Sequence, residues 1–358
     1  MSPAHTVIIA EAGVNHNGSL DRALELVDKA AIAGADVIKF QTFDAAKLAS
    51  ARAKKADYQV RNGEESGGQL EMLRRLQLSH DDHRRIIERC EATGIRFLSS
   101  PFDVASLRFL VENLGLAQIK LGSGELTNAP ILFEAGRLKV DLILSTGMAT
   151  LGEIEEALGV IALALGGGDP QPSRAAFADA LARPEAWQLL KRHVTLLHCT
   201  TEYPAPDAET NLLAMDTLRA AFGLRVGYSD HTQGISIGIA AAARGALVIE
   251  KHFTLSRSLP GPDHAASLEP DELTEFVREV RRTEVALGSG VKQPGASEAR
   301  NRDVARKSLV AARDLTAGAI LTDADVVVKR PGGGISPMMY WEIIGTRLDS
   351  DKAQDDLL

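Results

Sequence analysis

The segment RVGYSDHTQGISIGIAAAARGALVIEKH, which runs from Arg225 to His252, places a helical pattern between two short apolar runs. The runs are Arg225–Ser229 and Leu247–His252, and both have the length and apolar content of strands buried in a sheet. The stretch between them contains Gly245, and glycine commonly ends a helix. A strand, a helix and a second strand in this order predict two parallel strands joined by a helical crossover.

The same strand-and-helix unit repeats along the chain. The predicted strands are Thr6–Ala10, Asp36–Gln41, Arg96–Ser99, Ala117–Leu121, Asp141–Ser145, Val194–Cys199, Arg225–Ser229 and Leu247–His252. Eight such units predict an α/β protein with a (β/α)8 fold, the TIM barrel. An open, doubly wound sheet is the alternative. Against it, EAGVNHNG stands after the first strand, where a dinucleotide-binding sheet would carry GxGxxG.

Length and composition restrict the class of protein. The chain has 358 residues, of which 45% are hydrophobic and 25% charged, so we expect a globular protein rather than a disordered one. A net charge of −8 argues against nucleic acid as a partner. The sequence lacks the roughly 20-residue apolar run of a membrane helix, so we expect no membrane association. Two distant cysteines, Cys90 and Cys199, and an N-terminus without signal-peptide features predict a cytoplasmic location.

Changes in the pattern divide the chain into domains. Residues 1–287 hold the predicted barrel, and Gly166–Lys191 interrupts it with a Gly- and Pro-rich start and a helical later part, which predicts a surface excursion. Residues 288–303 are Gly-rich and charged without apolar periodicity, which predicts a linker. Residues 304–358 contain short strand-like runs joined by Gly-containing turns. They predict a second domain small enough to gain stability by docking on a partner.

In a barrel of parallel strands, the active-site groups come from the carboxyl ends of the strands. Each predicted strand ends in polar residues, and residues two apart on a strand share a face. In chain order these residues are Glu11, Lys39, Gln41, Ser99, Ser100, Lys120, Ser123, Glu125, Ser145, Thr146, His198, Thr200, Thr201, Glu202, Tyr203, Ser229, Asp230, His231, Glu250 and His252. Polar groups at all of the strand ends predict an enzyme.

Two of these residues, His231 and His252, end neighbouring strands. Their imidazoles can therefore converge on one divalent ion that keeps open positions for substrate and water. Asp230, Glu250 and Asp263 lie nearby in the sequence, and without a thiolate cluster Mn²⁺ or Mg²⁺ fits better than structural zinc. The alternative is that each histidine only binds a backbone carbonyl.

Lys39 and Lys120 also end barrel strands, where a buried ammonium group needs a partner of opposite charge. Hydrogen-bond donors for an anion are available from the glycine-rich stretches LGSGE and STGM and from Ser123, Ser145, Thr146 and Ser229. We therefore expect an anionic substrate. Two alternatives stay open: the lysines only stabilise the barrel by pairing with Glu11 or Glu125, or one of them forms a Schiff base, as in an aldolase.

In chain order, the motifs IIAEAGVNHNG, IKFQTF, IKLGSGEL, LSTGMA, CTTEYPAP, GYSDHT, EKHFT, PGPDHAASL and KRPGGGISP strongly resemble those of the sialic acid (nonulosonic acid) synthases. The resemblance runs from Val7 to about Gly345, which is nearly the whole chain. It implies a TIM barrel followed by an antifreeze-like (SAF) domain, here residues 304–358. It also implies a domain-swapped homodimer in which each small domain covers the barrel of its partner.

The resemblance further implies a reaction and the residues for it. The family condenses phosphoenolpyruvate with an N-acetylated mannose-type sugar and releases phosphate. The metal, Mn²⁺ or Mg²⁺, would be held by His231 and His252 and would polarise the sugar aldehyde as a Lewis acid. Glu125 would orient or deprotonate the attacking water, with Glu11 and Lys120 as further catalytic residues. Phosphoenolpyruvate would be bound by Lys39, Ser100, Lys120, Ser123, Ser145 and Ser229. The sugar would be bound by Glu11, Gln41, Thr201, Tyr203, Asp263 and the partner's Arg330.

The chain departs from the family pattern at CTTEYPAP, because members that use N-acetylmannosamine often have CTNxYPTP. Thr201 thus replaces an asparagine, and this exchange resembles members that use 2,4-diacetamido-2,4,6-trideoxymannose to make legionaminic acid. The shorter side chain removes an amide contact and leaves room in the pocket. We expect an N-acetylneuraminate synthase, with a legionaminic acid synthase as the alternative. A Schiff-base pyruvate aldolase and a non-catalytic glycan-binding protein are alternatives of other classes, and a 3-deoxy-heptulosonate synthase is a related condensing enzyme.

Overall fold

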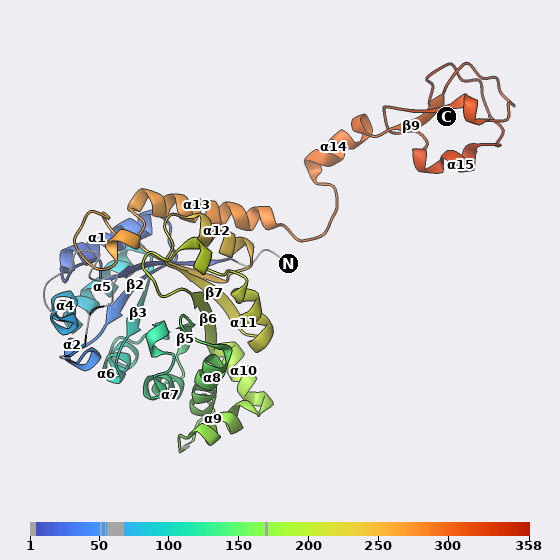
Figure 1. Cartoon of the computed structure of the whole chain (residues 1–358). Helices are drawn as coiled ribbons and strands as arrows, with labels where there is room; N and C mark the ends of the chain where they lie inside the picture. The colour runs from blue at the N-terminus through green and yellow to red at the C-terminus, as the bar shows by residue number, and fades with distance from the viewer. Residues whose placement is uncertain (1–4, 51, 54, 56–67, 169–170) are drawn as a thin grey trace. The chain divides into compact units, whose positions relative to one another are not determined.

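The chain forms two compact units that meet in the sequence at Ser289 and Gly290 (Figure 1). The computed structural model describes residues 5–50, 52–53, 55, 68–168 and 171–358. Within these ranges, no helix is long and apolar enough to cross a membrane. The larger unit contains the predicted barrel, and the smaller unit contains the predicted second domain.

The larger unit is built around an eight-stranded parallel sheet. Its strands are β1 (Val7–Gly13), β2 (Val37–Thr42), β3 (Arg96–Pro101), β4 (Gln118–Leu121), β5 (Asp141–Ser145), β6 (Val194–Cys199), β7 (Arg225–Asp230) and β8 (Val248–His252). Their hydrogen-bonded order is β3-β2-β1-β8-β7-β6-β5-β4, and the end strands β3 and β4 contact each other. Each strand therefore neighbours its predecessor and successor in the chain, as in a TIM barrel, which confirms the predicted fold.

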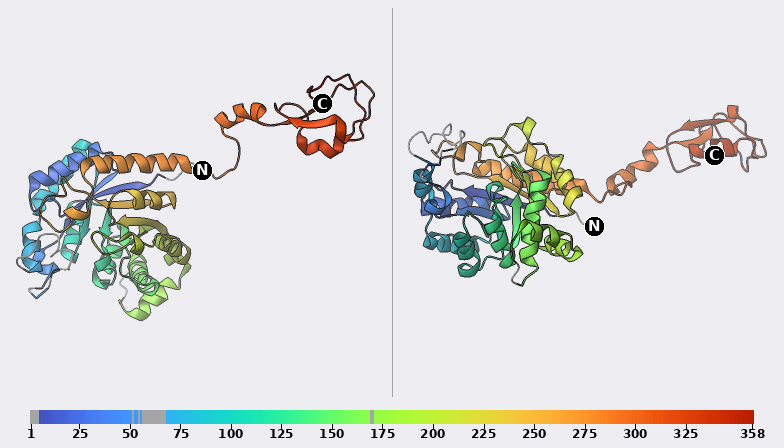
Figure 2. Two further views of the ribbon diagram at one scale, coloured as in Figure 1. Left: turned by 45° about the horizontal axis from the view of Figure 1, so that its top comes forward. Right: turned by 60° about the horizontal axis from the view of Figure 1, so that its bottom comes forward.

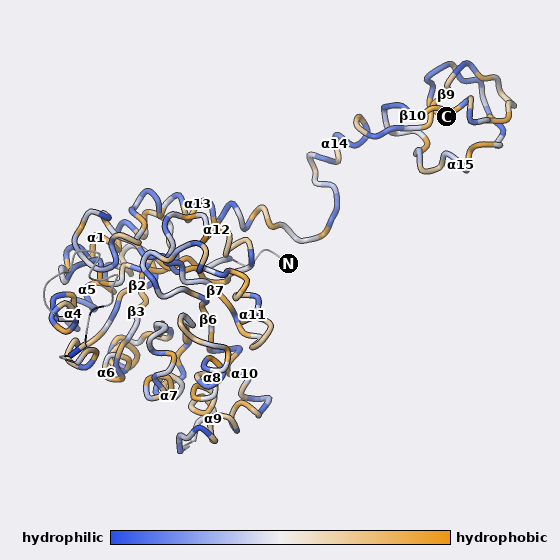
Figure 3. Tube along the Cα trace, viewed as in Figure 1, coloured by the Kyte–Doolittle hydropathy of each residue, from blue (hydrophilic) through white to orange (hydrophobic). Residues whose placement is uncertain are grey.

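Helices follow the strands, and most of them cover the outer face of the sheet (Figure 2), whereas the two short helices between β2 and the helix that precedes β3 pack in a separate small cluster. They are α1 (Leu20–Ile32), α2 (Ala45–Leu48), α4 (Gln69–Leu76), α5 (His80–Thr93), α6 (Val104–Arg108), α7 (Ala129–Arg137), α8 (Leu151–Leu165), α9 (Arg174–Leu181), α10 (Pro184–His193), α11 (Ala214–Phe222), α12 (Ser236–Ala243) and α13 (Pro270–Leu287). Hydrophilic and hydrophobic residues alternate along most of these helices, as Figure 3 shows, because one face meets the sheet and the other meets water.

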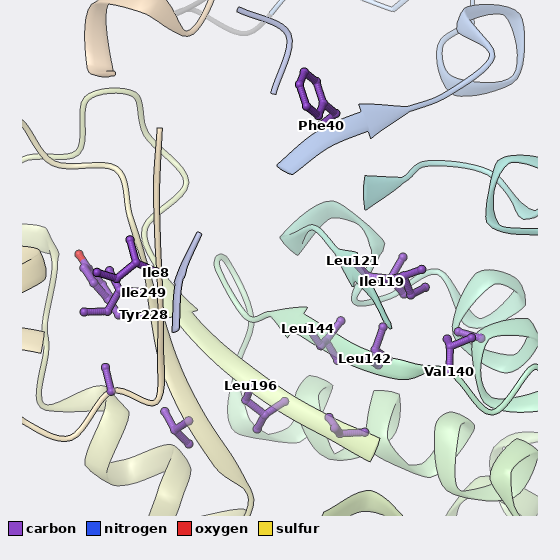
Figure 4. Packing of buried hydrophobic residues seen from close by; sticks show 14 of the residues in the cluster. Ile8, Phe40, Ile119, Leu121, Val140, Leu142, Leu144, Leu196, Tyr228 and Ile249 are labelled. Atoms are coloured by element: carbon purple, nitrogen blue, oxygen red, sulfur yellow. The ribbon is translucent and has the colours of Figure 1, made fainter. Parts of the chain in front are cut away.

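Side chains on the outer face of the sheet form the main core with the helices. Ile8, Ile119, Leu142, Leu196 and Ile249 are all at most 3% exposed and belong to this one cluster (Figure 4). These residues alternate with the side chains that point into the barrel, because successive residues of a strand face opposite ways. Packing against the helices thus fixes the positions of the strands, and the side chains on the inner face are not needed for that contact.

The inner face is divided into an apolar layer and a polar layer. The apolar layer is a separate buried cluster made of Ile9, Val37, Leu98, Ile143, Leu197 and Val248. Two residues further along the same strands stand Glu11, Lys39, Ser100, Ser145, Cys199 and Glu250. Because residues two apart share a face, the apolar cluster closes the barrel below and supports a polar layer at the carboxyl ends of the strands.

The predicted surface excursion Gly166–Lys191 is part of the outer layer of the barrel. Residues 169–170 lie outside the described ranges, but α9 and α10 both contact α8. Leu190 of α10 is fully buried in the main core. A Cβ atom on Gly159 of α8 would come within 2.9 Å of the carbonyl oxygen of Phe177, so glycine allows α9 to approach closely. The segment therefore lies on the surface, since most residues of the two helices are exposed or half-buried, and it is attached to the barrel through α8 and Leu190.

The smaller unit begins with a helix and has a core of its own. Its α14 (Ala296–Ala305) lies largely within the predicted linker, so that stretch is in part helical. Strands β9 (Ser308–Ala311) and β10 (Val326–Lys329) pair antiparallel, and α15 (Tyr340–Ile343) follows. The buried cluster of this unit is formed by Leu309, Ala311, Leu315, Leu321, Val326 and Leu348.

Candidate active site

A cavity of about 290 Å³ lies at the carboxyl ends of the strands in the larger unit. It is lined by most of the residues that the sequence predicts for the site. These residues are Glu11, Lys39, Gln41, Ser100, Lys120, Ser123, Ser145, Thr201, Tyr203, His231, His252 and Asp263. The structure therefore brings together the groups predicted for metal, anion and sugar binding in a single cavity.

The parallel register aligns these residues across neighbouring strands. Glu11 of β1 is the Cα partner of Lys39 in β2 and of His252 in β8. The register then shifts between Glu11 and Gly13, which is a bulge of the kind that reorients a side chain near a site. Gly13 has φ of 52°, a conformation that favours glycine, and a Cβ atom there would lie 3.0 Å from Glu11 Oε1.

Four buried charged side chains form a network across the floor of the cavity. Lys39 Nζ lies 2.7 Å from Glu11 Oε2 and 3.5 Å from Glu250 Oε2. Lys120 Nζ lies 3.1 Å from Glu250 Oε1. Each of the four side chains is at most 9% exposed, and Lys39 Nζ also donates a hydrogen bond to Ser100 Oγ at 3.2 Å. Two ammonium groups are thus placed side by side where an anionic substrate can reach them.

The environment shifts the pKa values of the two carboxyl groups in opposite directions. Burial raises the pKa of Glu11, and the negative charge of Glu250 adds to this, although Lys39 opposes it. Burial alone would also raise the pKa of Glu250, but the ammonium groups of Lys120 and Lys39 outweigh it and hold that pKa far below its usual range. Glu250 is therefore the permanent counter-ion, and Glu11 is the carboxyl group able to exchange a proton near neutral pH.

Several hydroxyl groups of the cavity have unused hydrogen-bonding capacity. Ser145 Oγ and Thr201 Oγ1 are buried and have no hydrogen-bond partner in the described part of the chain. Ser123 Oγ accepts a hydrogen bond from Gly147 N at 3.0 Å and lies 3.2 Å from Cys199 Sγ. A Cβ atom on Gly147 would lie 2.5 Å from Thr201 Oγ1, so glycine is required for these groups to converge. An unpaired buried hydroxyl is costly, and a bound ligand would satisfy it.

The two predicted metal-binding histidines lie side by side. The ring centroids of His231 and His252 are 5.4 Å apart, and the Tyr203 ring lies 4.3 Å and 5.4 Å from them. Burial lowers the pKa of His231 to about 4, and burial together with His231 lowers that of His252 well below its usual value. Both rings are therefore neutral at pH 7. His231 Nδ1 donates to the carbonyl oxygen of Thr200 at 2.6 Å, which leaves the lone pair on Nε2.

The nitrogen atoms of these rings fit a divalent cation. Ser229 Oγ lies 2.9 Å from Glu250 Oε1 and 3.2 Å from His231 Nε2, and its single proton goes to the carboxylate, so the Nε2 lone pair stays unused. His252 Nδ1 is buried without a hydrogen-bond partner among the described residues, 4.0 Å from Asp263 Oδ2. Within the described ranges, no cluster of three or more His, Cys, Asp or Glu side chains is arranged to hold a metal. The donor set fits an ion held by two imidazoles, with its other positions left to substrate and water.

Three of the predicted site residues do not line the cavity. Glu125 is in a 3-10 turn after β4, and its Oε2 accepts a hydrogen bond from Asn128 Nδ2 at 2.6 Å. Ser229 lies below the cavity, where it contacts Glu250 and His231. Arg330 belongs to the smaller unit and donates from Nε to the carbonyl oxygen of Ala305 at 3.1 Å. Glu125 was a candidate because it follows a strand and because of the family resemblance, and in the structure it lies outside the cavity lining.

The sequence analysis assigned no substrate role to two kinds of cavity residue. Glu250 was considered only as a neighbour of the metal, although it shares a face with His252 and joins both lysines. The signal that could have identified it is the presence of two buried lysines, which require more than one carboxylate. Gln69, Met72 and Leu76 of α4 also line the cavity. They come from a short helix beyond the strand ends, and the strand-end pattern says nothing about such a helix.

Comparison with known proteins agrees with this geometry. Residues 26–292 match the model of the NeuB family, and residues 306–358 match that of the SAF domain. An N,N'-diacetyllegionaminic acid synthase from Campylobacter jejuni is 46% identical over 353 residues, which cover 99% of this chain and 98% of that protein. A protein of the same name from Legionella pneumophila is 44% identical and covers 95% of this chain and 90% of its own length.

A solved structure shows the same similarity. The crystal structure of an N-acetylneuraminic acid (sialic acid) synthetase from Leptospira borgpetersenii aligns with a TM-score of 0.67 and 32% identity, and covers 83% of this chain and 90% of that one. The fold and the cavity define an enzyme of the sialic acid synthase type, with a TIM barrel and a SAF domain. The chain belongs to the NeuB family.

Proposed function

We propose that this chain is a legionaminic acid synthase, which condenses phosphoenolpyruvate with 2,4-diacetamido-2,4,6-trideoxymannose. The observation that carries the proposal is the pair of buried lysines surrounded by unpaired hydroxyls, in a chain 46% identical to an N,N'-diacetyllegionaminic acid synthase. The relatives at 46% and 44% identity favour this product over N-acetylneuraminate, which was the first expectation. The synthase class itself follows from the family.

Phosphoenolpyruvate carries a phosphate and a carboxylate, and Lys39 and Lys120 supply the matching positive charges. Binding such an anion lets both ammonium groups exchange part of their pairing with Glu11 and Glu250 for the substrate, without leaving any charge unpaired. Ser100, Ser123 and Ser145 add hydroxyl donors from neighbouring strand ends, and Ser229 holds Glu250 from below. Because these groups come from rigid strands, they hold the enol carbon in one orientation toward the sugar aldehyde.

His231 and His252 would hold the divalent ion, with Mn²⁺ preferred and Mg²⁺ as the alternative. When bound, the ion supplies Lewis-acid polarisation of the aldehyde oxygen. The chain keeps both imidazoles neutral by burial, which is the protonation state that binds a cation. Thr200 fixes the ring of His231 through its Nδ1–H. Tyr203 packs against both rings and limits the volume left for water.

The reaction requires one proton acceptor for the attacking water. C3 of phosphoenolpyruvate bonds to the aldehyde carbon, the aldehyde oxygen gains a proton, and water adds to C2 and loses one. The bond from C2 to the phosphate oxygen then breaks, the new C2 hydroxyl gives its remaining proton to the departing phosphate, and C2 becomes the carbonyl carbon of the 2-keto acid. Glu11 is placed to take the proton from water because its carboxyl group lies in the cavity and near Lys39. Glu125, the first candidate for this role, faces Asn128.

The sugar would lie on the side of the cavity formed by Gln41, Tyr203, Asp263 and Thr201. Burial raises the pKa of Asp263 to about 6 although Lys39 lowers it, so its carboxyl group can accept or donate a hydrogen bond to a sugar hydroxyl. Thr201 also lines a neighbouring cavity of about 930 Å³. Its unpaired hydroxyl is therefore placed to meet a second acetamido group, for which an asparagine would leave less room.

Arg330 would complete the sugar site from a second copy of the chain. In this arrangement two chains form a domain-swapped homodimer, and the partner's Arg330 contacts an acetamido group of the sugar. The support for this proposal is the resemblance to the family and the exposed guanidinium group, which binds only one backbone carbonyl through Nε in the described part of its own chain. A second chain would supply the remaining partners for its N–H groups.

The test of the proposed substrate is phosphate release from phosphoenolpyruvate with Mn²⁺, measured in parallel with the diacetamido sugar and with N-acetylmannosamine. The proposal predicts a kcat/KM at least tenfold higher for the diacetamido sugar. Thr201→Asn is the matched variant, and it should lower that ratio because the amide fills the space next to the cavity. A preference of the parent chain for N-acetylmannosamine would assign it to N-acetylneuraminate synthesis instead.

A further inference from the structure

A second buried ion pair lies on the opposite face of the strands that carry the two histidines. Asp230 of β7 and Lys251 of β8 are Cα partners in the sheet. Lys251 Nζ lies 2.9 Å from Asp230 Oδ2, and both side chains are 0% exposed. Because side chains alternate along a strand, this pair points out of the barrel, toward the helices, and takes no part in the cavity.

The pair also holds the loop that follows β7. Lys251 Nζ donates a hydrogen bond to the carbonyl oxygen of Thr232 at 2.6 Å. Asp230 Oδ1 accepts hydrogen bonds from the backbone N–H of Thr232 at 2.9 Å and from its hydroxyl at 2.7 Å. The residues on both sides of His231 are therefore attached to each other and to β8, and Thr232 is itself completely buried.

Stability alone does not account for charged side chains at this position. Helix α12 covers the pair closely, since a Cβ atom on Gly238 would lie 3.1 Å from Asp230 Oδ2 and 2.7 Å from the ring of Phe276. A buried ion pair costs so much desolvation that apolar residues of similar volume usually stabilise a protein equally well or better. What an apolar pair cannot do is form hydrogen bonds to the backbone of the loop.

We propose that the Asp230–Lys251 pair is a positioning device that sets the separation of the His231 and His252 imidazoles. The inference rests on the proposed function, because it assigns the two rings to one divalent ion. Each member of the pair is the immediate neighbour of one histidine, so the link between strands on the outer face fixes the distance between rings on the inner face. Groups that orient metal ligands in this way commonly change metal affinity 10- to 100-fold when they are removed.

The test compares two variants of the full chain by calorimetric titration with Mn²⁺. Asp230→Asn keeps an oxygen for Thr232 and leaves Lys251 bonded to the Thr232 carbonyl, so Mn²⁺ affinity should stay within about threefold of the parent, while the unpaired buried ammonium lowers the melting temperature. Asp230→Asn combined with Lys251→Met removes the link from β8 while leaving no charge buried. This double variant should bind Mn²⁺ 10- to 100-fold more weakly, with its melting temperature near that of the parent.

A folded double variant with the Mn²⁺ affinity of the parent would overturn the proposal. If that variant does not fold, Asp230→Asn with Lys251→Gln fills the site with neutral polar groups and is judged by the same affinity criterion. A control at the other end of the barrel, Asp36→Asn with Arg281→Met, also removes an ion pair but should leave Mn²⁺ affinity unchanged.

Two further measurements separate this inference from the proposed function. If the His252→Ala variant binds Mn²⁺ as tightly as the parent chain does, the assignment of the metal site itself is wrong. Crystal structures of parent and double variant test the positioning without metal, because the proposal predicts that the ring centroids move apart from 5.4 Å. Unchanged rings in the double variant would refute the positioning role even if the metal site is real.

Discussion

Glu11 and Glu250 carry the same chemical group in one cavity, and their neighbours decide what each can do. Glu250 touches two ammonium groups and a hydroxyl, so it stays ionised and holds the lysines in place. Glu11 pairs with one ammonium group, that of Lys39, and accepts a hydrogen bond from Gln41, and burial together with the charge of Glu250 raises its pKa. A base must be able to accept a proton at the working pH, and this separates the two roles.

This difference predicts the effect of two matched substitutions. Glu11→Gln removes the proposed proton acceptor and should lower kcat for phosphate release 10²- to 10⁴-fold, the range for general-base catalysis. Glu125→Gln should lower kcat less than about tenfold, because that carboxyl group does not line the cavity and its bond to Asn128 can be made by an amide oxygen. Steady-state kinetics with both substrates saturating measures the two values. The reverse order would return the role of base to Glu125.

At the residue scale, the side chains that line the cavity were predictable from sequence where alternating residues of a strand face opposite sides of the sheet. Lys39, Ser100, Ser145, His231 and His252 line the cavity because each stands at the end of an apolar run. Glu125 does not line the cavity, because it comes four residues after the last strand residue, Leu121, where a 3-10 turn sets the direction of the side chain. Backbone direction in such a turn depends on packing, and no periodicity reports it.

At the scale of elements, one glycine controls how closely two strands meet inside the barrel. A Cβ atom on Gly227 of β7 would lie 2.3 Å from the carbonyl oxygen of Val248 and 2.7 Å from the Leu197 side chain. Backbone cannot move away as a flexible side chain can. Gly227→Ala should therefore reduce the free energy of unfolding by about 3 kcal/mol, the upper end of the cost of overpacking.

The control for this prediction is Gly152→Ala in α8. No atom lies within 4 Å of the position of its Cβ, and alanine is the better helix former, so the free energy of unfolding should rise by up to about 1 kcal/mol. Urea unfolding followed by circular dichroism measures both variants. Equal effects of the two substitutions would show that the β7–β8 contact is looser than the structure describes.

The ion pair between Asp36 and Arg281 predicts a pH dependence of stability. Arg281 of α13 binds Asp36 Oδ2 at 2.6 Å and the carbonyl oxygen of Thr6 at 2.8 Å, so it ties the last barrel helix to the first strands. Burial raises the pKa of Asp36, but His5, the backbone N–H of Ile8 and Arg281 outweigh it, and the pKa falls below 3.8. The stabilisation is therefore complete above about pH 4 and is lost as the pH falls through the lower folded value.

The variant Asp36→Asn isolates this contribution. At pH 7 it should lower the free energy of unfolding by about 1 kcal/mol, since solvent screens a partly exposed pair. The difference from the parent should shrink toward zero near pH 2, when the carboxyl group of the parent is protonated too. Urea titrations at both pH values measure it, and a difference that is constant with pH would mean that charge plays no part.

The strand bounds were predictable from sequence to within two residues, except that β1 ends at Gly13, three residues after the predicted Ala10, and β5 and β6 show why. Each has consecutive apolar residues at its centre, Leu142–Leu144 in β5 and Leu196–Leu197 in β6, and their bounds coincide with Asp141–Ser145 and Val194–Cys199 as expected. Helix α14 was predicted as part of a linker because its residues are exposed and carry no apolar stripe. Helices α9 and α10 were predicted as a surface excursion because only contact with α8 reveals what they bury.

At the scale of the whole molecule, the two units have separate hydrophobic cores. The main cluster of the barrel is formed by residues up to Val280, and the cluster of the smaller unit begins at Leu309. A chain that ends at residue 288 should therefore fold and unfold cooperatively. If the SAF domain of a second copy completes the sugar site, the truncated chain should have a KM for the sugar raised at least tenfold, with a smaller change in the KM for phosphoenolpyruvate.

Arg330→Ala in the full chain is the variant matched to the truncation, and it should also raise the KM for the sugar. Light scattering of parent and truncated chain reports the oligomeric state at the same time. Full activity of the truncated chain, or a parent chain that is monomeric while active, would refute the role proposed for Arg330.

The central claim is that the polar layer of the barrel binds phosphoenolpyruvate and a metal ion for one condensation reaction. The most direct measurement is phosphate release from phosphoenolpyruvate with the diacetamido sugar, before chelation, after chelation with EDTA, and after Mn²⁺ is restored. The account predicts release that needs the sugar, stops on chelation and returns with Mn²⁺. Activity that survives chelation, together with borohydride trapping of pyruvate on Lys39 or Lys120, would contradict it and establish a Schiff-base aldolase instead.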